Sequence, residues 1–493
     1  MAAATSKKIA YHGSIYFIGN ILRYAVSFIM LPIYTRVLTP ADYGILELLS
    51  MVIDLSGIIF GLRIGEAIFR FYLEYDTQDM KNRVISTALL MTFMLNVVGL
   101  AIILSLSGTI SELVLNGTSY QHLLSLFSLT LLFGPMIEIP MTFIRAQQRP
   151  WLFVSMSTLK LGLQLSLNIY LVVFRQMGVT GVIFSSVIAS GAMAILLGGY
   201  SLHQTGIRFS RSTAKDLAVF SYPLVLTAII SFYVTFGDRY FLKLYGSLTD
   251  VGLYALGYRF GFLLSFIGTG PFFAIWDSER YHVLKRPDAR ETFQQVFIFF
   301  STFSILIAVL ISVFSKNVVM VMADPDFWPA VRIVPIVIMG YFFQGWAGFC
   351  NLGIMIEKKT LLITHSVVIT AVVITVLYFL LIPRFGAMGA AWATLIGYAV
   401  RFLYIHWNAA KLYNMELPWK RVLLLFPPCI IAMLASFLCS NDLLLSLIIN
   451  VAVVLLLAFV ITTIPVLSLD HRLLLRRMLL KPWMLKKLMR RIF

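Results

Sequence analysis

Apolar runs of about 20 residues, separated by short polar segments, follow one another along nearly the whole chain. A run of this length spans the hydrocarbon core of a bilayer as an α-helix. The first run follows Lys7 and Lys8 but is too long for a signal peptide and has no small-residue cleavage site, so we expect it to be retained. The pattern predicts fourteen spans, at residues 14–38, 43–65, 84–106, 120–144, 150–174, 178–200, 217–242, 251–276, 293–315, 331–355, 360–382, 387–410, 420–440 and 443–467.

Two short motifs recur at an offset of 208 residues. The Asp-Tyr-Gly at 42–44 returns as Asp-Val-Gly at 250–252, and the Gly-Val-Thr-Gly at 178–181 returns as Gly-Ala-Met-Gly at 386–389. Many secondary transporters are built from duplicated helix bundles. The repeat therefore predicts two six-helix lobes within an all-α polytopic membrane protein. The expected division is 1–210, 211–415, two further helices within 416–470, and a basic tail at 471–493.

Composition and charge agree with a membrane protein. The chain is 60% hydrophobic and 12% charged, which excludes a soluble domain with a polar surface. The net charge of +17 comes from basic residues concentrated in alternate loops, so the positive-inside rule places both termini in the cytoplasm and nucleic acid is not expected as a partner. Residues 471–493 carry eight Lys and Arg, which suits a helix anchored on anionic membrane lipids.

No motif indicates catalysis or a bound cofactor. The three cysteines, Cys350, Cys429 and Cys439, lie in apolar runs without metal-ligand spacing. A nucleotide-binding phosphate loop, a zinc-protease motif and a nucleophile elbow are all absent from the sequence. We therefore expect neither an enzyme nor a metal or cofactor site.

The repeated segments also predict local structure. Thr39-Pro40-Ala41-Asp42 and Ser247-Leu248-Thr249-Asp250 have the residues of a helix start, so Asp42 and Asp250 are interpreted as caps rather than transport residues. The glycine pairs at 178–181 and 386–389 permit close helix contact. Tight packing is the simpler interpretation of these pairs, and a pivot during transport is the alternative.

Charges inside predicted spans are the candidate functional residues. A basic side chain at the bilayer centre costs about 2.5–3.5 kcal/mol on insertion scales, so it usually faces a cavity or a partner. Because the set is drawn from both halves, it predicts an electropositive cleft between the bundles that binds phosphate groups. The alternatives are structural pairing with Asp54, Glu138 or helix carbonyls, and, for Arg401 and Arg63, snorkelling to the membrane surface. The five basic residues are Arg23, Lys160, Arg259, Arg401 and Arg63.

Four further embedded residues have two interpretations each. Asp54 and Glu138 are candidates for binding a coupling proton or sodium ion, or for ion pairs with cavity cations. Asp238 and Arg239, near the outer end of the seventh span, form either an outer gate or a local ion pair at the interface.

The segment from Leu31 to Gly44, Leu-Pro-Ile-Tyr-Thr-Arg-Val-Leu-Thr-Pro-Ala-Asp-Tyr-Gly, resembles the opening signature of bacterial polysaccharide flippases of the O-antigen or Wzx type. Three further segments are similar to stretches of that family: Arg145–Arg149, Gly237–Arg239 and Val251–Tyr254. The resemblance implies the fold of multidrug-and-toxin exporters, two six-helix lobes in a V, here with two additional C-terminal helices.

The resemblance also implies a function. Its substrate would be an oligosaccharide on undecaprenyl diphosphate, flipped across the bacterial inner membrane by alternating access for O-antigen, capsule or exopolysaccharide synthesis. Arg23 and Arg259 match helices that carry cavity arginines in related flippases, and Lys160 would join them on the diphosphate. Polysaccharide polymerase and chain-length machinery are the implied protein partners. A cation-coupled multidrug exporter is the nearer alternative, and a membrane polymerase the more distant one.

Overall fold

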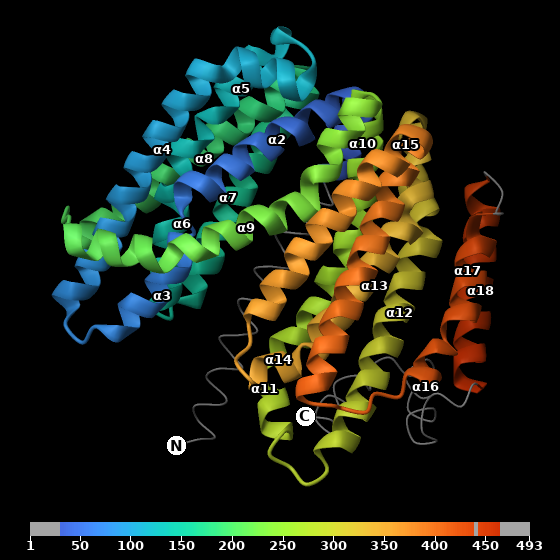
Figure 1. Cartoon of the computed structure of the whole chain (residues 1–493). Coiled ribbons are helices and arrows are strands. Elements are labelled where there is room, and N and C mark those ends of the chain that lie inside the picture. The colour runs from blue at the N-terminus through green and yellow to red at the C-terminus, as the bar shows by residue number, and fades with distance from the viewer. Residues whose placement is uncertain (1–29, 438–441, 464–493) are drawn as a thin grey trace. The chain divides into compact units, whose positions relative to one another are not determined.

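The computed structural model describes residues 30–437 and 442–463, and these are helical with no β-strand among them (Figure 1). Two expectations lie outside the described residues: Arg23 with the first part of the first span, and the basic tail at 471–493. Cys439 also lies outside them.

The described chain divides into two compact units. Unit 1 comprises the described residues through Ala255 together with Met322–Phe327, and unit 2 comprises Leu256–Val321 and the described residues from Trp328 onward. This grouping keeps the seventh predicted span with unit 1, whereas the sequence-based division placed the lobe boundary at residue 210. That boundary stays a prediction.

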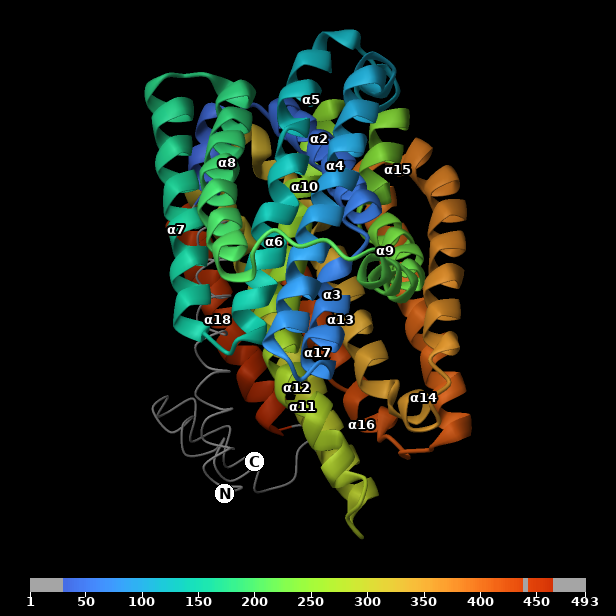
Figure 2. The ribbon, with the colours of Figure 1, turned by 90° about the vertical axis from the view of Figure 1, so that its left-hand side faces the viewer.

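Unit 1 contains a helix at 30–37 and a series of labelled elements that ends in the first turns of α10. Here α3 continues the span of α2 after a break, and α7 lies beside α8 (Figure 2). The elements are α2 (Pro40–Gly61), α3 (Ile64–Glu74), α4 (Gln78–Leu115), η1 (Thr118–Tyr120), α5 (Gln121–Ser128), α6 (Thr130–Ala146), α7 (Pro150–Asn168), η2 (Ile169–Phe174), α8 (Gly178–Thr205), α9 (Arg211–Tyr245) and α10 (Leu248–Leu263).

Unit 2 continues from α10 and includes the last two helices. In this unit α13 packs along α15, and α17 pairs with α18 (Figure 1). The elements are η3 (Leu264–Thr269), α11 (Gly270–Val283), α12 (Ala289–Met322), η4 (Pro325–Ile333), α13 (Val334–Cys350), α14 (Leu352–Ile356), α15 (Leu361–Leu412), α16 (Trp419–Leu423), α17 (Phe426–Phe437) and α18 (Leu443–Thr463).

The predicted spans correspond closely to these helices. Eleven helices within the described residues are long and apolar enough to cross a membrane. One of them, α15, contains two predicted spans and bends at Gly386, where φ is 52° and ψ is −130°. Gly178, its counterpart in the first copy, also has a positive φ, of 55°. The repeated glycine therefore has a positive φ in both copies, which costs glycine little.

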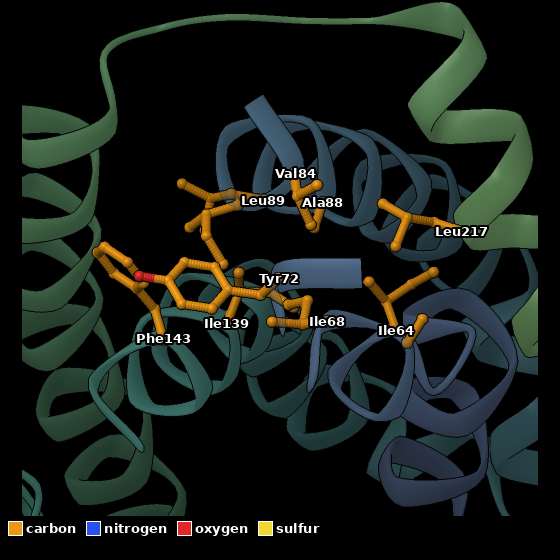
Figure 3. Packing of buried hydrophobic residues seen from close by; sticks show 11 residues of the cluster. Ile64, Ile68, Tyr72, Val84, Ala88, Leu89, Ile139, Phe143 and Leu217 are labelled. Atoms are coloured by element: carbon orange, nitrogen blue, oxygen red, sulfur yellow. The ribbon is translucent and has the colours of Figure 1, made fainter. Parts of the chain in front are cut away.

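The core of unit 1 lies where α3, α4, α6 and α9 meet. Ile64, Ile68 and Tyr72 repeat at helical spacing on α3 and pack against Leu89 of α4 and Phe143 of α6 (Figure 3). The rings of Tyr72 and Phe143 meet edge to face, with centroids 5.9 Å apart. This packing fixes α3 against α4 and α6, and thereby positions the break between α2 and α3.

The core of unit 2 is dominated by aromatic rings. Trp346 of α13 contacts the rings of Phe297, Phe402 and Trp419, with centroids 5.2–5.9 Å apart, and its indole N–H donates to the Ser301 hydroxyl at 2.9 Å. Aromatic pairs of this kind contribute beyond the area that they bury. The interior of unit 2 is therefore filled by side chains around α13.

The two repeated segments meet in unit 1. Thr39 and Asp42 form a capping box at the start of α2, and Ser247 and Asp250 make the same reciprocal hydrogen bonds at the start of α10. The interpretation of both aspartates as caps is confirmed. A Cβ on Gly44 would lie 2.0 Å from the Leu248 carbonyl oxygen, and a Cβ on Gly252 would lie 1.8 Å from that of Pro40. The contact is reciprocal between equivalent positions, and only glycine permits it.

Candidate functional site

Unit 1 encloses a cavity of about 1080 Å³ between its helices. This volume lies slightly above the range of about 300–1,000 Å³ that is typical of small-molecule sites. The wall is formed by α2, α4, α6, α7, α8 and α9. Five charged side chains line it: Asp54, Arg63, Glu138, Arg145 and Lys160.

One end of the cavity lies at the turn that joins α6 to α7. Arg145 is in the last turn of α6, and its guanidinium lies 5.2 Å from the ring centroid of Phe69 and 5.5 Å from that of Phe153 on α7. It also donates to the Thr142 hydroxyl at 3.2 Å. The aromatic contacts hold this cation in place while it stays exposed.

Lys160 lies farther along α7 on the same cavity wall. Ser157, one turn before it, is 8% exposed and its hydroxyl has no hydrogen-bond partner within the described residues. A buried hydroxyl without a partner costs free energy, because its hydrogen bonds to water are not replaced. The wall around Lys160 therefore contains a buried hydroxyl that makes no hydrogen bond within the described residues.

Arg63 enters the cavity from the break between α2 and α3. Its φ is 52°, in the left-handed region, and the preceding residue Leu62 has a φ of 50°. The Arg63 guanidinium lies 3.4 Å from the Glu66 carboxylate, but the side chains are 47% and 59% exposed. An exposed pair of this kind contributes about 0–1 kcal/mol, so the guanidinium exchanges partners at little cost.

Glu138 lies on the cavity wall together with the two arginines. It is attracted by Arg63 and Arg145 and repelled by Glu66. Gly65 of α3 leaves room for it, since a Cβ there would lie 3.1 Å from a Glu138 carboxylate oxygen. Prolines at 135 and 140 flank Glu138 within α6. The carboxylate is therefore held among the basic side chains and balances part of their charge.

Of the nine residues predicted from the sequence, four come together in this cavity: Lys160, Arg63, Asp54 and Glu138. Arg259 of α10 and Arg401 of α15 belong to unit 2. The Nε of Arg401 is buried without a hydrogen-bond partner within the described residues. Substrate binding by the basic residues stays a prediction, and so does ion coupling or ion pairing by Asp54 and Glu138.

Arg145 lines the cavity and was not among the predicted site residues. The hydrophobic run ends at residue 144, so Arg145 was assigned to a loop, whereas α6 continues to Ala146. The one feature of the sequence that pointed to Arg145 was its position in the family-like segment Arg145–Arg149. Phe232 and Phe236, on the α9 wall of the cavity, were also missed, because an aromatic residue within an apolar run has no distinctive pattern.

Asp238 and Arg239 are buried inside unit 1, at 0% and 2% exposure. One Asp238 carboxylate oxygen accepts from the Arg239 guanidinium at 2.6 Å, and the other accepts from the Tyr254 hydroxyl at 2.6 Å. The Arg239 guanidinium also donates to the Thr235 carbonyl at 2.8 Å and lies 4.0 Å from Glu47 of α2. The pair thus joins α9 to α10 and α2, and a role as an outer gate stays a prediction.

Among the described residues, no group of three or more His, Cys, Asp or Glu side chains is close enough to hold a metal ion. Cys350 and Cys429 are both buried free thiols. The chemistry available in the cavity is therefore charge pairing, hydrogen bonding and aromatic contact.

The model of the polysaccharide biosynthesis protein family matches residues 9–274, which is more than half of the chain. The chain belongs to this family. The match includes every described helix that lines the cavity, so the cavity lies within the part of the chain that defines the polysaccharide biosynthesis family. The sequence-based recognition of a polysaccharide flippase family is confirmed.

Solved structures show that the chain shares its fold with known membrane transporters. The lipid II flippase MurJ in an inward closed conformation aligns with a TM-score of 0.69 at 15% identity, covering 92% of this chain and 99% of that one. An inward-facing multidrug resistance MATE family transporter aligns with a TM-score of 0.59 at 15% identity, covering 80% and 94%. A MATE transporter from Vibrio cholerae aligns with a TM-score of 0.56 at 14% identity, covering 84% and 98%.

At such identities these likenesses establish the fold. The predicted fold class, an all-α membrane protein of the multidrug-and-toxin-exporter type, is confirmed. No curated protein matches the chain by sequence. The chain is thus a multi-pass membrane protein of the polysaccharide biosynthesis family with the fold of a transporter.

Proposed function

We propose that this protein is a flippase that carries oligosaccharides on undecaprenyl diphosphate from the cytoplasmic to the outer leaflet of the bacterial inner membrane. The observation that carries the proposal is the unit 1 cavity, where Arg63, Arg145 and Lys160 outnumber Asp54 and Glu138. Basic groups that outnumber the acidic ones suit a substrate with phosphate groups. Membership of the polysaccharide biosynthesis family supplies the saccharide part of the proposal.

The diphosphate binds by exchange of ion partners. Arg63 and Arg145 already attract Glu138, and the Arg63–Glu66 pair is exposed and weak, so a diphosphate displaces these carboxylates at little cost. Arginine suits this role because its planar donors match phosphate oxygens in pairs. Arg23, Arg259 and Arg401 are further candidates for contacts with the diphosphate. The lipid tail remains in the bilayer during the transfer.

No bond is made or broken in this process, so the protein is a transporter and not an enzyme. Asp54 and Glu138 stay candidates for a coupling proton or sodium ion, and Asp238 and Arg239 for an outer gate. With both termini in the cytoplasm, the cavity end at the α6–α7 turn opens inward, where the substrate is made. Anionic lipids, a polymerase and chain-length machinery are the proposed partners in O-antigen, capsule or exopolysaccharide synthesis.

A cation-coupled multidrug exporter is the second candidate. It is favoured by the likeness to MATE transporters and by the presence of Asp54 and two phenyl rings in the cavity. A basic majority in the same cavity opposes it, since organic cations would be repelled by Lys160, Arg63 and Arg145. Binding of such cations by the purified protein would favour this candidate.

The deciding experiment measures translocation of a fluorescent undecaprenyl-diphosphate oligosaccharide in proteoliposomes. We expect protein-dependent flipping that falls at least tenfold in Lys160→Ala and in Arg145→Ala. Lys215→Ala serves as the matched control, because Lys215 is exposed on α9 and does not line the cavity. Flipping that both cavity variants retain would make these residues structural, and no flipping by the wild type would overturn the proposal.

A further inference from the structure

The cavity of unit 1 has two chemically different parts. Two of its three basic groups, Arg63 and Arg145, lie at the α2–α3 break and the α6–α7 turn, and the third, Lys160, lies farther along α7. The opposite part, toward the start of α6, is lined by uncharged polar side chains, including Asn96, Gln164 and Thr130. Thr130 and Arg145 lie fifteen residues apart on α6, which corresponds to about 22 Å along the helix. A diphosphate at the basic part therefore leaves the other part of the cavity unfilled.

Two phenyl rings form an apolar surface on the α9 wall. Phe232 and Phe236 are one helical turn apart, and their ring centroids are separated by 4.9 Å with a tilt of 32°. Both side chains are only partly buried, and they line a cavity that also holds charged side chains. The Arg239 guanidinium lies 4.8 Å from the centroid of Phe236 and fixes that ring on the wall. Exposed rings in a polar cavity cost free energy unless a ligand covers them.

Two glycines elsewhere on the cavity wall keep space open. Gly57 of α2 and Gly134 of α6 line the cavity, and a Cβ built on either would meet no atom within 4 Å. The fold therefore does not require glycine for packing at these positions. Asp54, one turn before Gly57, supplies a carboxylate acceptor, and Gln164 of α7 supplies an amide whose N–H donates to Ser186 at 3.0 Å.

We propose that Phe232, Phe236 and Asp54, with the amide side chains of Asn96 and Gln164 on the same cavity wall, form a saccharide subsite distinct from the basic subsite for the diphosphate. A sugar ring has an apolar face of C–H groups and a rim of hydroxyls, so it needs a flat apolar surface beside hydrogen-bonding groups. This part of the cavity offers both. A phosphate has no apolar face to cover the rings, and an organic cation would meet the basic majority of the same cavity.

This inference rests on the proposed function, so its test separates the sugar from the lipid diphosphate. The full-length protein in nanodiscs is titrated with undecaprenyl diphosphate and with the same lipid carrying N-acetylglucosamine, glucose or galactose. We expect at least one glycosylated lipid to bind more tightly than the bare lipid. The Phe232→Ala/Phe236→Ala double variant should lose about tenfold in affinity for that lipid, or about 1.4 kcal/mol, and bind the bare lipid as the wild type does.

Two further variants make the result specific. Arg145→Gln should weaken binding of the bare and the glycosylated lipid alike, because it removes a diphosphate contact in the basic part of the cavity. Phe174→Ala is the matched control, since Phe174 is 74% exposed and lies outside the cavity. Unchanged binding of the bare lipid also shows that the double variant is folded.

The possible failures are distinguishable. If the wild type binds the bare lipid and all three glycosylated lipids equally, the saccharide subsite is overturned while the flippase proposal stands. If the wild type binds none of these lipids, the proposed function and the subsite are both overturned. Binding of tetraphenylphosphonium that the double variant loses would assign the phenyl rings to organic cations and overturn the subsite.

Discussion

At the scale of single residues, the pair Asp238 and Arg239 is the most constrained polar feature of unit 1. Both side chains are almost fully buried, and Asp238 accepts hydrogen bonds from Arg239 and Tyr254. Burying two charges is costly, and their attraction offsets the cost only while both are present. Removing the negative charge should leave the Arg239 guanidinium buried without its closest carboxylate.

We therefore expect Asp238→Asn to destabilise the protein strongly, by about 3–5 kcal/mol. Tyr254→Phe removes one hydrogen bond to Asp238 and should cost less, about 1–3 kcal/mol. Thermal unfolding of the purified variants in detergent measures both effects. The control is Asp216→Asn, because Asp216 is exposed on the same helix. An unfolding temperature of Asp238→Asn equal to that of Asp216→Asn would show that the buried pair does not stabilise unit 1.

At the scale of elements, the crossing of α2 and α10 depends on two glycines. The atom nearest to a Cβ on Gly44 or Gly252 is a backbone carbonyl oxygen of the opposite helix, at 2.0 and 1.8 Å. Backbone atoms cannot rotate away as a side chain does. A methyl group at either position must therefore push the two helices apart.

Gly44→Ala or Gly252→Ala should lower the stability of unit 1 by about 1–3 kcal/mol, the usual cost of overpacking. Gly199→Ala in α8 is the matched control, since a Cβ there meets no atom within 4 Å, and alanine favours a helix by up to about 1 kcal/mol. Limited proteolysis and thermal unfolding compare the three variants. If Gly44→Ala resists proteolysis as well as Gly199→Ala does, the close contact is not needed for stability.

The last helix is attached to unit 2 by a buried polar network. Asn450 of α18 donates to the Val313 carbonyl at 3.0 Å and to the Asn317 side chain at 2.6 Å, and Asn317 donates to Ser446 at 3.1 Å. In a membrane, interhelical hydrogen bonds of this kind contribute about 0.6 kcal/mol on average and up to about 2 kcal/mol. The network also specifies which face of the apolar helix α18 contacts α12, since α18 itself has apolar residues on all sides.

The spans could be predicted because hydropathy and length determine them. The sequence predicted two separate spans on either side of Gly386, where the continuous helix α15 bends. The caps at Asp42 and Asp250 followed from residue types alone. The cavity could not be predicted as a whole. Helical rise gives the depth of Lys160 or Arg63, but which helices face each other depends on packing. For this reason Arg145, at the end of an apolar run, and the phenyl rings of α9 were missed.

At the scale of the whole molecule, the charge of the cavity suggests how the membrane potential acts on transport. The described lining residues include three basic and two acidic side chains, a formal charge of +1. A diphosphate with two negative charges changes this to −1. An inside-negative potential then favours outward movement of the loaded cavity and inward return of the empty one. Moving two negative charges outward across 100 mV gains about 4.6 kcal/mol.

We therefore expect translocation to depend on voltage. Proteoliposomes with a potassium gradient and valinomycin set the potential, and flipping of a fluorescent undecaprenyl-diphosphate oligosaccharide is measured in both directions. Movement toward the positive side should accelerate several-fold, and movement toward the negative side should slow, because the substrate is the only charge transferred in a full cycle. Equal potassium concentrations with the same ionophore are the control. Equal rates at both polarities would mean that a coupling ion cancels the substrate charge. The first variants to test would then be those that replace the carboxylates of Asp54 and Glu138 with amides.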